Sequence, residues 1–86
     1  MNKKQHKFKV GDMVYYIAMD DNMHYTVFAS TIIAAGMSMG EWKYLVKHKH
    51  VNLLRPEKNL YREIEPAKAA CANLNKQEQK NESKNI

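Results

Sequence analysis

The hydrophobic pattern becomes regular at residue 8, in the stretch FKVGDMVYYIA. Gly11 and Asp12 are turn residues, and the β-branched and aromatic run after them predicts a strand. If Val10 points inward, the two-residue period of a strand puts Val14, Tyr16 and Ala18 on the same inner face. The opposite face is also apolar and consists of Met13, Tyr15 and Ile17. We therefore expect this second face to be covered or to bind a partner.

Two further strands are predicted between residues 24 and 51. The Asp- and Asn-rich residues 19–23 favour a turn, and the β-branched residues 24–35 favour a long strand. Gly36 and Gly40 bracket Met37 and Met39, which suggests a hairpin connection. Residues 41–51 alternate cleanly. One face carries Trp42, Tyr44, Val46, His48 and His50, and the lysines on the other face, Lys43, Lys47 and Lys49, mark the solvent side.

The remaining chain predicts a short strand, one helix and two polar ends. Pro56 cannot lie in a central strand, and the chain is expected to return to the core at Leu60 and Tyr61. Glu65 and Pro66 suit a helix start, so a helix is expected over residues 65–76. Its stripe of small apolar residues comprises Ala67, Ala70, Cys71 and Leu74. Residues 1–7 are expected to form a flexible basic arm, and residues 77–86 a disordered tail.

These features resemble a group of short bacterial and phage proteins with an SH3-like barrel, similar in shape to KOW and Tudor modules. The matching features are Phe8, Val10, Gly11, Asp12, Val14 and Tyr15, then a long second strand, Tyr44 and Val46 in the third, and NLY before an Ala-rich helix. The resemblance implies a mainly β fold: an SH3-like barrel of about five strands over residues 8–64, with the C-terminal helix packed on it. It implies a binding role and carries over no catalytic residue.

Charge and composition limit the classes of protein to which this chain could belong. The chain has 86 residues and a net charge of +5, which predicts one small domain. Residues 1–9 carry four lysines and no acidic residue, whereas residues 10–66 carry six basic and seven acidic side chains. The lone cysteine, Cys71, excludes an internal disulfide and fits a reducing compartment. With no run of eighteen apolar residues and no targeting segment, the expectation is a cytoplasmic protein.

The candidates for chemistry are few. An HxH pair, His48 and His50, could join His24 as zinc ligands, but neighbouring lysines would repel the cation. No activated nucleophile, phosphate loop or paired acid and base is recognisable. Cys71 lies on the small-residue stripe and is expected to be buried. We therefore expect no enzyme activity, no cofactor and no metal.

Two binding hypotheses remain. The first is a protein-interaction module, for example an accessory or anti-defence protein of a phage or mobile element. It would bind a protein partner, or a second copy of the chain, through Met13, Tyr15, Ile17, Met37 and Met39. The alternative is a nucleic-acid-binding protein whose basic third strand and its neighbour supply Lys43, Lys47, Lys49 and Arg55. The near-neutral middle of the chain favours the first hypothesis.

Overall fold

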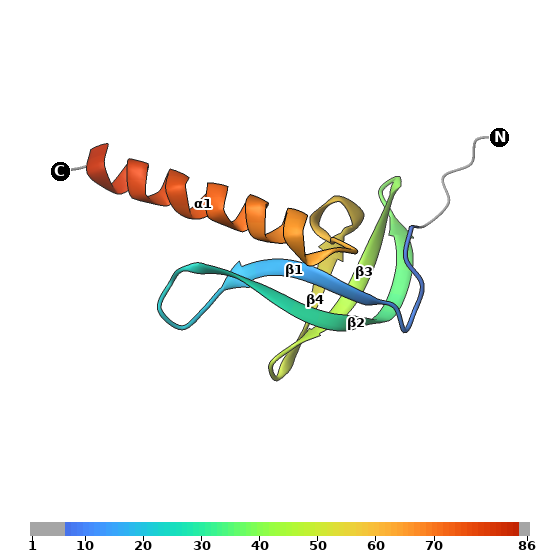
Figure 1. Cartoon of the computed structure of the whole chain (residues 1–86). Helices are drawn as coiled ribbons and strands as arrows, with labels where there is room; N and C mark the ends of the chain where they lie inside the picture. Colours follow the sequence, from blue (N-terminus) through green and yellow to red (C-terminus); the bar gives the residue numbers. More distant parts are fainter. Residues whose placement is uncertain (1–6, 85–86) are drawn as a thin grey trace.

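The computed structural model describes residues 7–84 and consists of an antiparallel sheet with one C-terminal helix (Figure 1). The four strands lie in the order β1-β2-β3-β4, so that each pairs with its neighbour in sequence. Their bounds are Met13–Met19 for β1, Tyr25–Ser38 for β2, Glu41–His48 for β3 and Val51–Pro56 for β4. A 3-10 turn, Glu57–Asn59, and the helix α1, Ile64–Lys84, complete the chain. The mainly β expectation is therefore confirmed.

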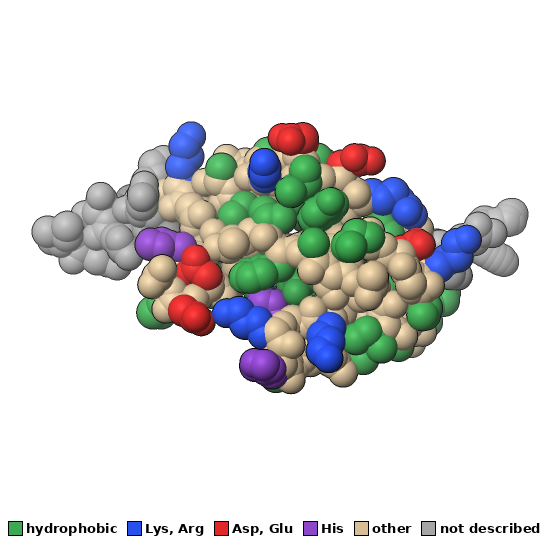
Figure 2. Space-filling view, turned by 60° about the horizontal axis from the view of Figure 1, so that its bottom comes forward, with side chains coloured by type: hydrophobic (Ala, Val, Ile, Leu, Met, Phe, Trp, Pro, Cys, Tyr) green, Lys and Arg blue, Asp and Glu red, His purple; other side chains and the backbone are tan. Residues whose placement is uncertain are grey.

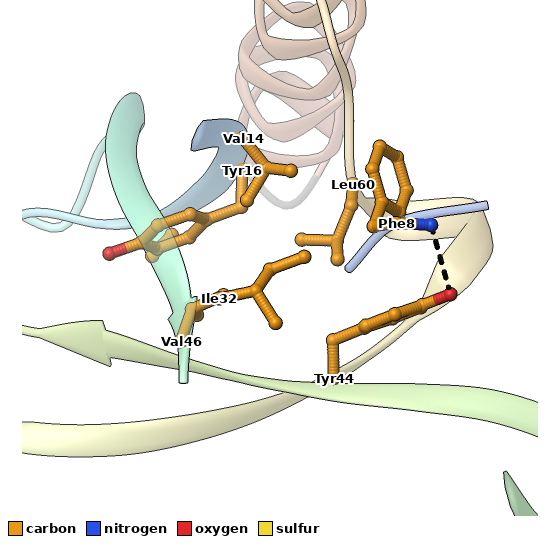
Figure 3. Packing of buried hydrophobic residues seen from close by; sticks show 8 residues of the cluster. Phe8, Val14, Tyr16, Ile32, Tyr44, Val46 and Leu60 are labelled. Atoms are coloured by element: carbon orange, nitrogen blue, oxygen red, sulfur yellow. Dashed lines mark hydrogen bonds between the residues drawn. The ribbon is translucent and has the colours of Figure 1, made fainter. Parts of the chain in front are cut away.

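The core lies on the inner face of the sheet, where side chains from distant segments meet (Figure 3). The inner residues of β1 that the period of two predicts are buried, as are Tyr44 and Val46 of β3. Tyr44 is fully buried, and its hydroxyl donates a 2.6 Å hydrogen bond to Glu57 and accepts one of 3.3 Å from the Phe8 N–H. Burial and the adjacent Glu57 carboxylate raise the pKa of Tyr44. The residue therefore stays a neutral phenol that links three segments.

The strand β2 changes its partner halfway along its length. Residues 25–31 pair with β1, and residues 32–38 pair with β3, with a register shift between Ile32 and Ala34. A bulge of this kind bends the strand and increases its twist, and β2 curves visibly in Figure 1. Because of the bend, this 14-residue strand pairs with β1 along its first half and with β3 along its second half.

The entry to β1 differs from the expectation at Val10, which is 63% exposed. Asp12 closes a tight turn with Lys9. Its side chain accepts a hydrogen bond from the Lys9 N–H, and its own N–H donates one to the Lys9 carbonyl. Gly11, at a φ of +96°, donates to the Ile32 carbonyl. This turn directs Val10 outward. Phe8 is buried in the core, edge-on to Tyr44.

The C-terminal helix is longer than the sequence predicts. It begins at Ile64, close to the expected start, but continues to Lys84 instead of ending at residue 76. Residues 77–84 contain mainly Gln, Glu, Lys and Asn, several of which are good helix formers, so no residue type there stops the helix. Only residues 85–86 of the expected tail lie outside the described residues, as do residues 1–6 of the expected arm.

The sheet is open, and the expected fifth strand is reduced to one bridge. Tyr61 pairs with Tyr15 through two backbone hydrogen bonds of 2.8 and 2.9 Å. This bridge lies on the side of β1 that β2 does not use. It brings the chain after the 3-10 turn back to the start of the sheet and places the first turn of α1 there.

Candidate functional site

The outer groove is a shallow apolar depression on the face of the sheet opposite the core. Its volume is about 300 Å³. Small residues of β2 form one side, and leucines from β3 and β4 form the other, since Ala34 pairs with Leu45 and Leu45 with Leu54. The residues that line it are Ala34, Ala35, Gly36, Met37, Ser38, Lys43, Leu45 and Leu54.

The second half of β2 is exposed although it is almost wholly apolar. Residues 33–39, IAAGMSM, carry no charge, and each of them is exposed. Among the described residues, 34–38 pair with β3 alone, which leaves the other edge of this half-strand open. Uncharged open edges of this kind pair readily with another extended chain.

The tip of the β2–β3 hairpin is built for a tight turn. Met39 and Gly40 both have positive φ angles, +50° and +82°, as the two central residues of a type I′ turn require. The Met39 side chain is 96% exposed. The tip therefore presents an apolar side chain next to the outer groove.

The five apolar residues predicted to bind a partner do not form one surface. Met13 pairs with Thr31, so it lies six positions along β2 from Met37, or roughly 20 Å. Tyr15 is half-buried, and its backbone forms the bridge to Tyr61. Ile17 lines a cavity beside the helix. Only Met37 and Met39 lie at the outer groove or next to it.

The four basic residues of the alternative hypothesis are also dispersed. Lys43 lines the outer groove, and Lys47 lies on the same face of β3 beyond Leu45. Lys49 lies in the β3–β4 turn, 3.2 Å from Asp21 and 6.0 Å from the centre of the Phe28 ring. Arg55 lies in the helix-side cavity described below. On the face shown in Figure 2, Lys and Arg side chains are scattered among hydrophobic and acidic ones.

The helix-side cavity lies between α1 and the sheet and has a volume of about 480 Å³. The residues that line it are Ile17, Tyr25, Arg55, Asn59, Tyr61, Ala70, Asn73 and Leu74. Arg55 reaches it because it pairs with Tyr44, whose side chain points to the inner face. Its Nε is buried and has no hydrogen-bond partner.

An amide clamp holds the helix beside this cavity. Asn75 accepts a 3.0 Å hydrogen bond from the Tyr25 N–H and donates one of 3.1 Å to the Tyr25 carbonyl. One turn earlier, Cys71 is buried, and burial raises the pKa of its thiol, with the Asp20 carboxylate adding to the effect. The thiol therefore lies on the packed side of the helix.

The three histidines considered as zinc ligands, His24, His48 and His50, do not lie together. His48 packs edge-on against Phe28, and its Nδ1 lies 3.0 Å from the Tyr16 hydroxyl, which also donates to the Lys47 carbonyl. His24 and His50 are exposed. Among the side chains that the structure describes, no group of three or more His, Cys, Asp or Glu could hold a metal ion.

Sequence reasoning missed the groove because its members belong to three separate segments. Leu45 shares a face with lysines and reads as a solvent-side residue, and Leu54 lies in a stretch that predicts only a short strand or turn. The small residues Ala34 to Gly36 weaken the strand prediction. The one usable signal was the uncharged run at residues 31–40, whose apolar side chains lack a periodicity that would bury them.

Comparisons of this chain with protein-family models, curated proteins and solved structures find no match. The helix α1 is too polar to cross a membrane, and no other helix described between residues 7 and 84 is long enough to do so.

Proposed function

We propose that this protein is a non-catalytic binding module that holds an extended segment of a partner protein at the outer groove. The observation that carries the proposal is the exposed, uncharged half-strand at residues 33–39, which adjoins an apolar groove and has one open edge. In strand addition of this kind, backbone hydrogen bonds supply affinity and side-chain pockets supply specificity.

The charges at the groove suggest what the partner segment looks like. Lys43 lines the groove and Lys47 lies on the same face of β3, while no acidic residue lines the groove. A segment whose groove-facing side chains include both apolar and acidic residues would place the apolar ones against Leu45 and Leu54 and the carboxylates near the lysines. We therefore infer an apolar, acidic strand as the occupant.

The proposal includes an SH3-like fold. Four features support it: the β1–β4 meander, the bent second strand, the 3-10 turn after β4, and the return of Tyr61 to β1. Folds of this size commonly bind peptides or nucleic acids, so the fold does not choose between partners, and the surface has to do so.

A selection from a displayed peptide library tests the proposal. Wild-type protein is the bait, and binding peptides are counter-selected against Leu54→Lys, which places a charge in the groove at a position that is 59% exposed and so leaves the fold intact. Met13→Lys, at a position 54% exposed on β1, is the matched control. We expect apolar, acidic peptides that bind wild type and Met13→Lys and lose binding to Leu54→Lys by roughly tenfold or more.

Three other results would replace the proposal. Enrichment of peptides that bind all three proteins equally would move the site away from the groove. Binding of labelled oligonucleotides with a steep salt dependence, weakened by a Lys43→Glu, Lys47→Glu double variant, would favour the nucleic-acid alternative. A mass that rises with concentration for wild type and stays monomeric for Leu54→Lys would identify a second copy of the chain as the occupant.

A further inference from the structure

The helix-side cavity has the composition of a small-molecule site. Its volume of about 480 Å³ is within the range of cavities that enclose drug-sized ligands, roughly 300–1,000 Å³. Apolar side chains of β1 and α1 and two tyrosines, Tyr25 and Tyr61, form most of its lining. Such sites combine apolar walls with a few polar groups that fix the orientation of a ligand. The cavity shares no lining residue with the outer groove, so it is a separate site.

Arg55 gives this cavity a positive charge that forms no ion pair with a described acidic side chain. No residue lining the cavity is acidic, and the ion pairs between described side chains involve Lys49 and Arg62 instead. The Nε of Arg55 is buried without a hydrogen-bond partner. Leaving such a donor unpaired is unfavourable, so an acceptor placed in the cavity would gain from bonding to it.

The polar groups around Arg55 favour a planar anion. A guanidinium binds carboxylate and phosphate oxygens through two parallel hydrogen bonds. The side-chain amides of Asn59 and Asn73 lie on the lining too and supply both donors and acceptors. The tyrosines and Leu74 supply area for an aromatic or apolar body. An inorganic ion would leave that area unused.

We propose that the helix-side cavity binds a small organic anion, in which Arg55 bonds to a carboxylate or phosphate and an aromatic or apolar body packs between α1 and the sheet. The clamp formed by Asn75 and Tyr25 keeps the helix in place at this site. Binding there joins α1 to β4, so it stabilises the docked helix.

Isothermal titration calorimetry with two probe pairs tests the proposal. Indole-3-acetate and adenosine monophosphate represent carboxylates and phosphates, and indole-3-acetamide and adenosine are their neutral counterparts. We expect at least one anion to bind with a Kd below about 1 mM and its neutral counterpart to bind roughly tenfold more weakly or worse. Which anion binds distinguishes the two chemistries.

Three variants locate the binding. Arg55→Gln should weaken binding of the anion by roughly tenfold or more and leave binding of the neutral compound unchanged. Ala70→Met fills the cavity without changing its charge and should block binding of both the anion and the neutral compound. Lys58→Gln removes the same charge from an exposed position outside the cavity and should bind like wild type. Circular dichroism confirms the fold of each variant. The proposal is overturned if neither anion binds, if the neutral compounds bind equally well, if Arg55→Gln or Ala70→Met binds like wild type, or if Lys58→Gln weakens binding as much as Arg55→Gln does.

Discussion

The two halves of β2 share one backbone and have opposite surroundings. Residues 25–31 pair with β1, and Tyr25 bonds to Asn75 of α1. Most side chains of residues 25–32 are at least half-buried, and Ile32 is part of the core. Residues 33–38, past the bulge, are exposed throughout although they are as apolar as the first half. Because both halves are uncharged and largely apolar, the difference in burial follows from what covers each half.

Coverage in this molecule comes from the helix and the N-terminal segment. The helix contacts β1 and β2, and the backbone of Gly11 and Asp12 bonds to Ile32, where the covered half of β2 ends. No described strand pairs with residues 33–38 on that side. An apolar strand left bare at this point is the physical reason for placing a partner there, since exposed apolar surface beside an open edge favours association.

The largest expected difference between covered and bare positions is in stability. Tyr44→Ala removes a fully buried ring and its bonds to Glu57 and Phe8, which we expect to cost about 3–5 kcal/mol of the free energy of unfolding. Met37→Ala, at a half-exposed position on the bare half, should cost less than about 0.5 kcal/mol. Urea denaturation followed by circular dichroism measures both. Similar costs for the two variants would mean that residues 33–38 are packed in solution.

The next effect concerns how the helix is held over the covered half. Asn75→Ala removes both hydrogen bonds of the amide clamp, so it should lower the free energy of unfolding by about 1–2 kcal/mol. Cys71 reports on the same docking, since burial suppresses its thiolate. Its reaction with a disulfide reagent should therefore speed up in Asn75→Ala.

Asn73→Ala is the matched control for the helix clamp. Asn73 lies on the same helix and is exposed at the mouth of the cavity. Its replacement should change neither the stability nor the thiol reaction appreciably. If both asparagine variants lose the same stability, the loss does not come from the clamp, because alanine favours a helix more than asparagine does.

The sequence predicts the covered region better than the bare one, for a physical reason. Period-two alternation identifies buried positions such as Val14, Tyr16 and Tyr44, because a strand with one face in the core must separate its side chains in this way. The bare half has no such constraint. Its groove depends on the register of Ala34, Leu45 and Leu54 across three strands, which local patterns do not encode. The extent of α1 also escaped prediction, because its polar second half has no apolar stripe to reveal it.

The smallest expected effect lies at the tip of the bare half. Met39 has a φ of +50°, a conformation that asparagine adopts more readily than methionine, and an Asn-Gly pair is preferred at the centre of a type I′ turn. Met39 is also 96% exposed, so its replacement sacrifices no packing. Met39→Asn should therefore raise the free energy of unfolding by about 0.5 kcal/mol, measured by urea denaturation. If the partner segment contacts only the groove, the variant keeps peptide affinity while gaining stability. A loss of affinity together with the gain in stability would extend the binding surface from the groove to the hairpin tip, and would show that the turn tolerates strain at Met39 because the side chain is used in binding.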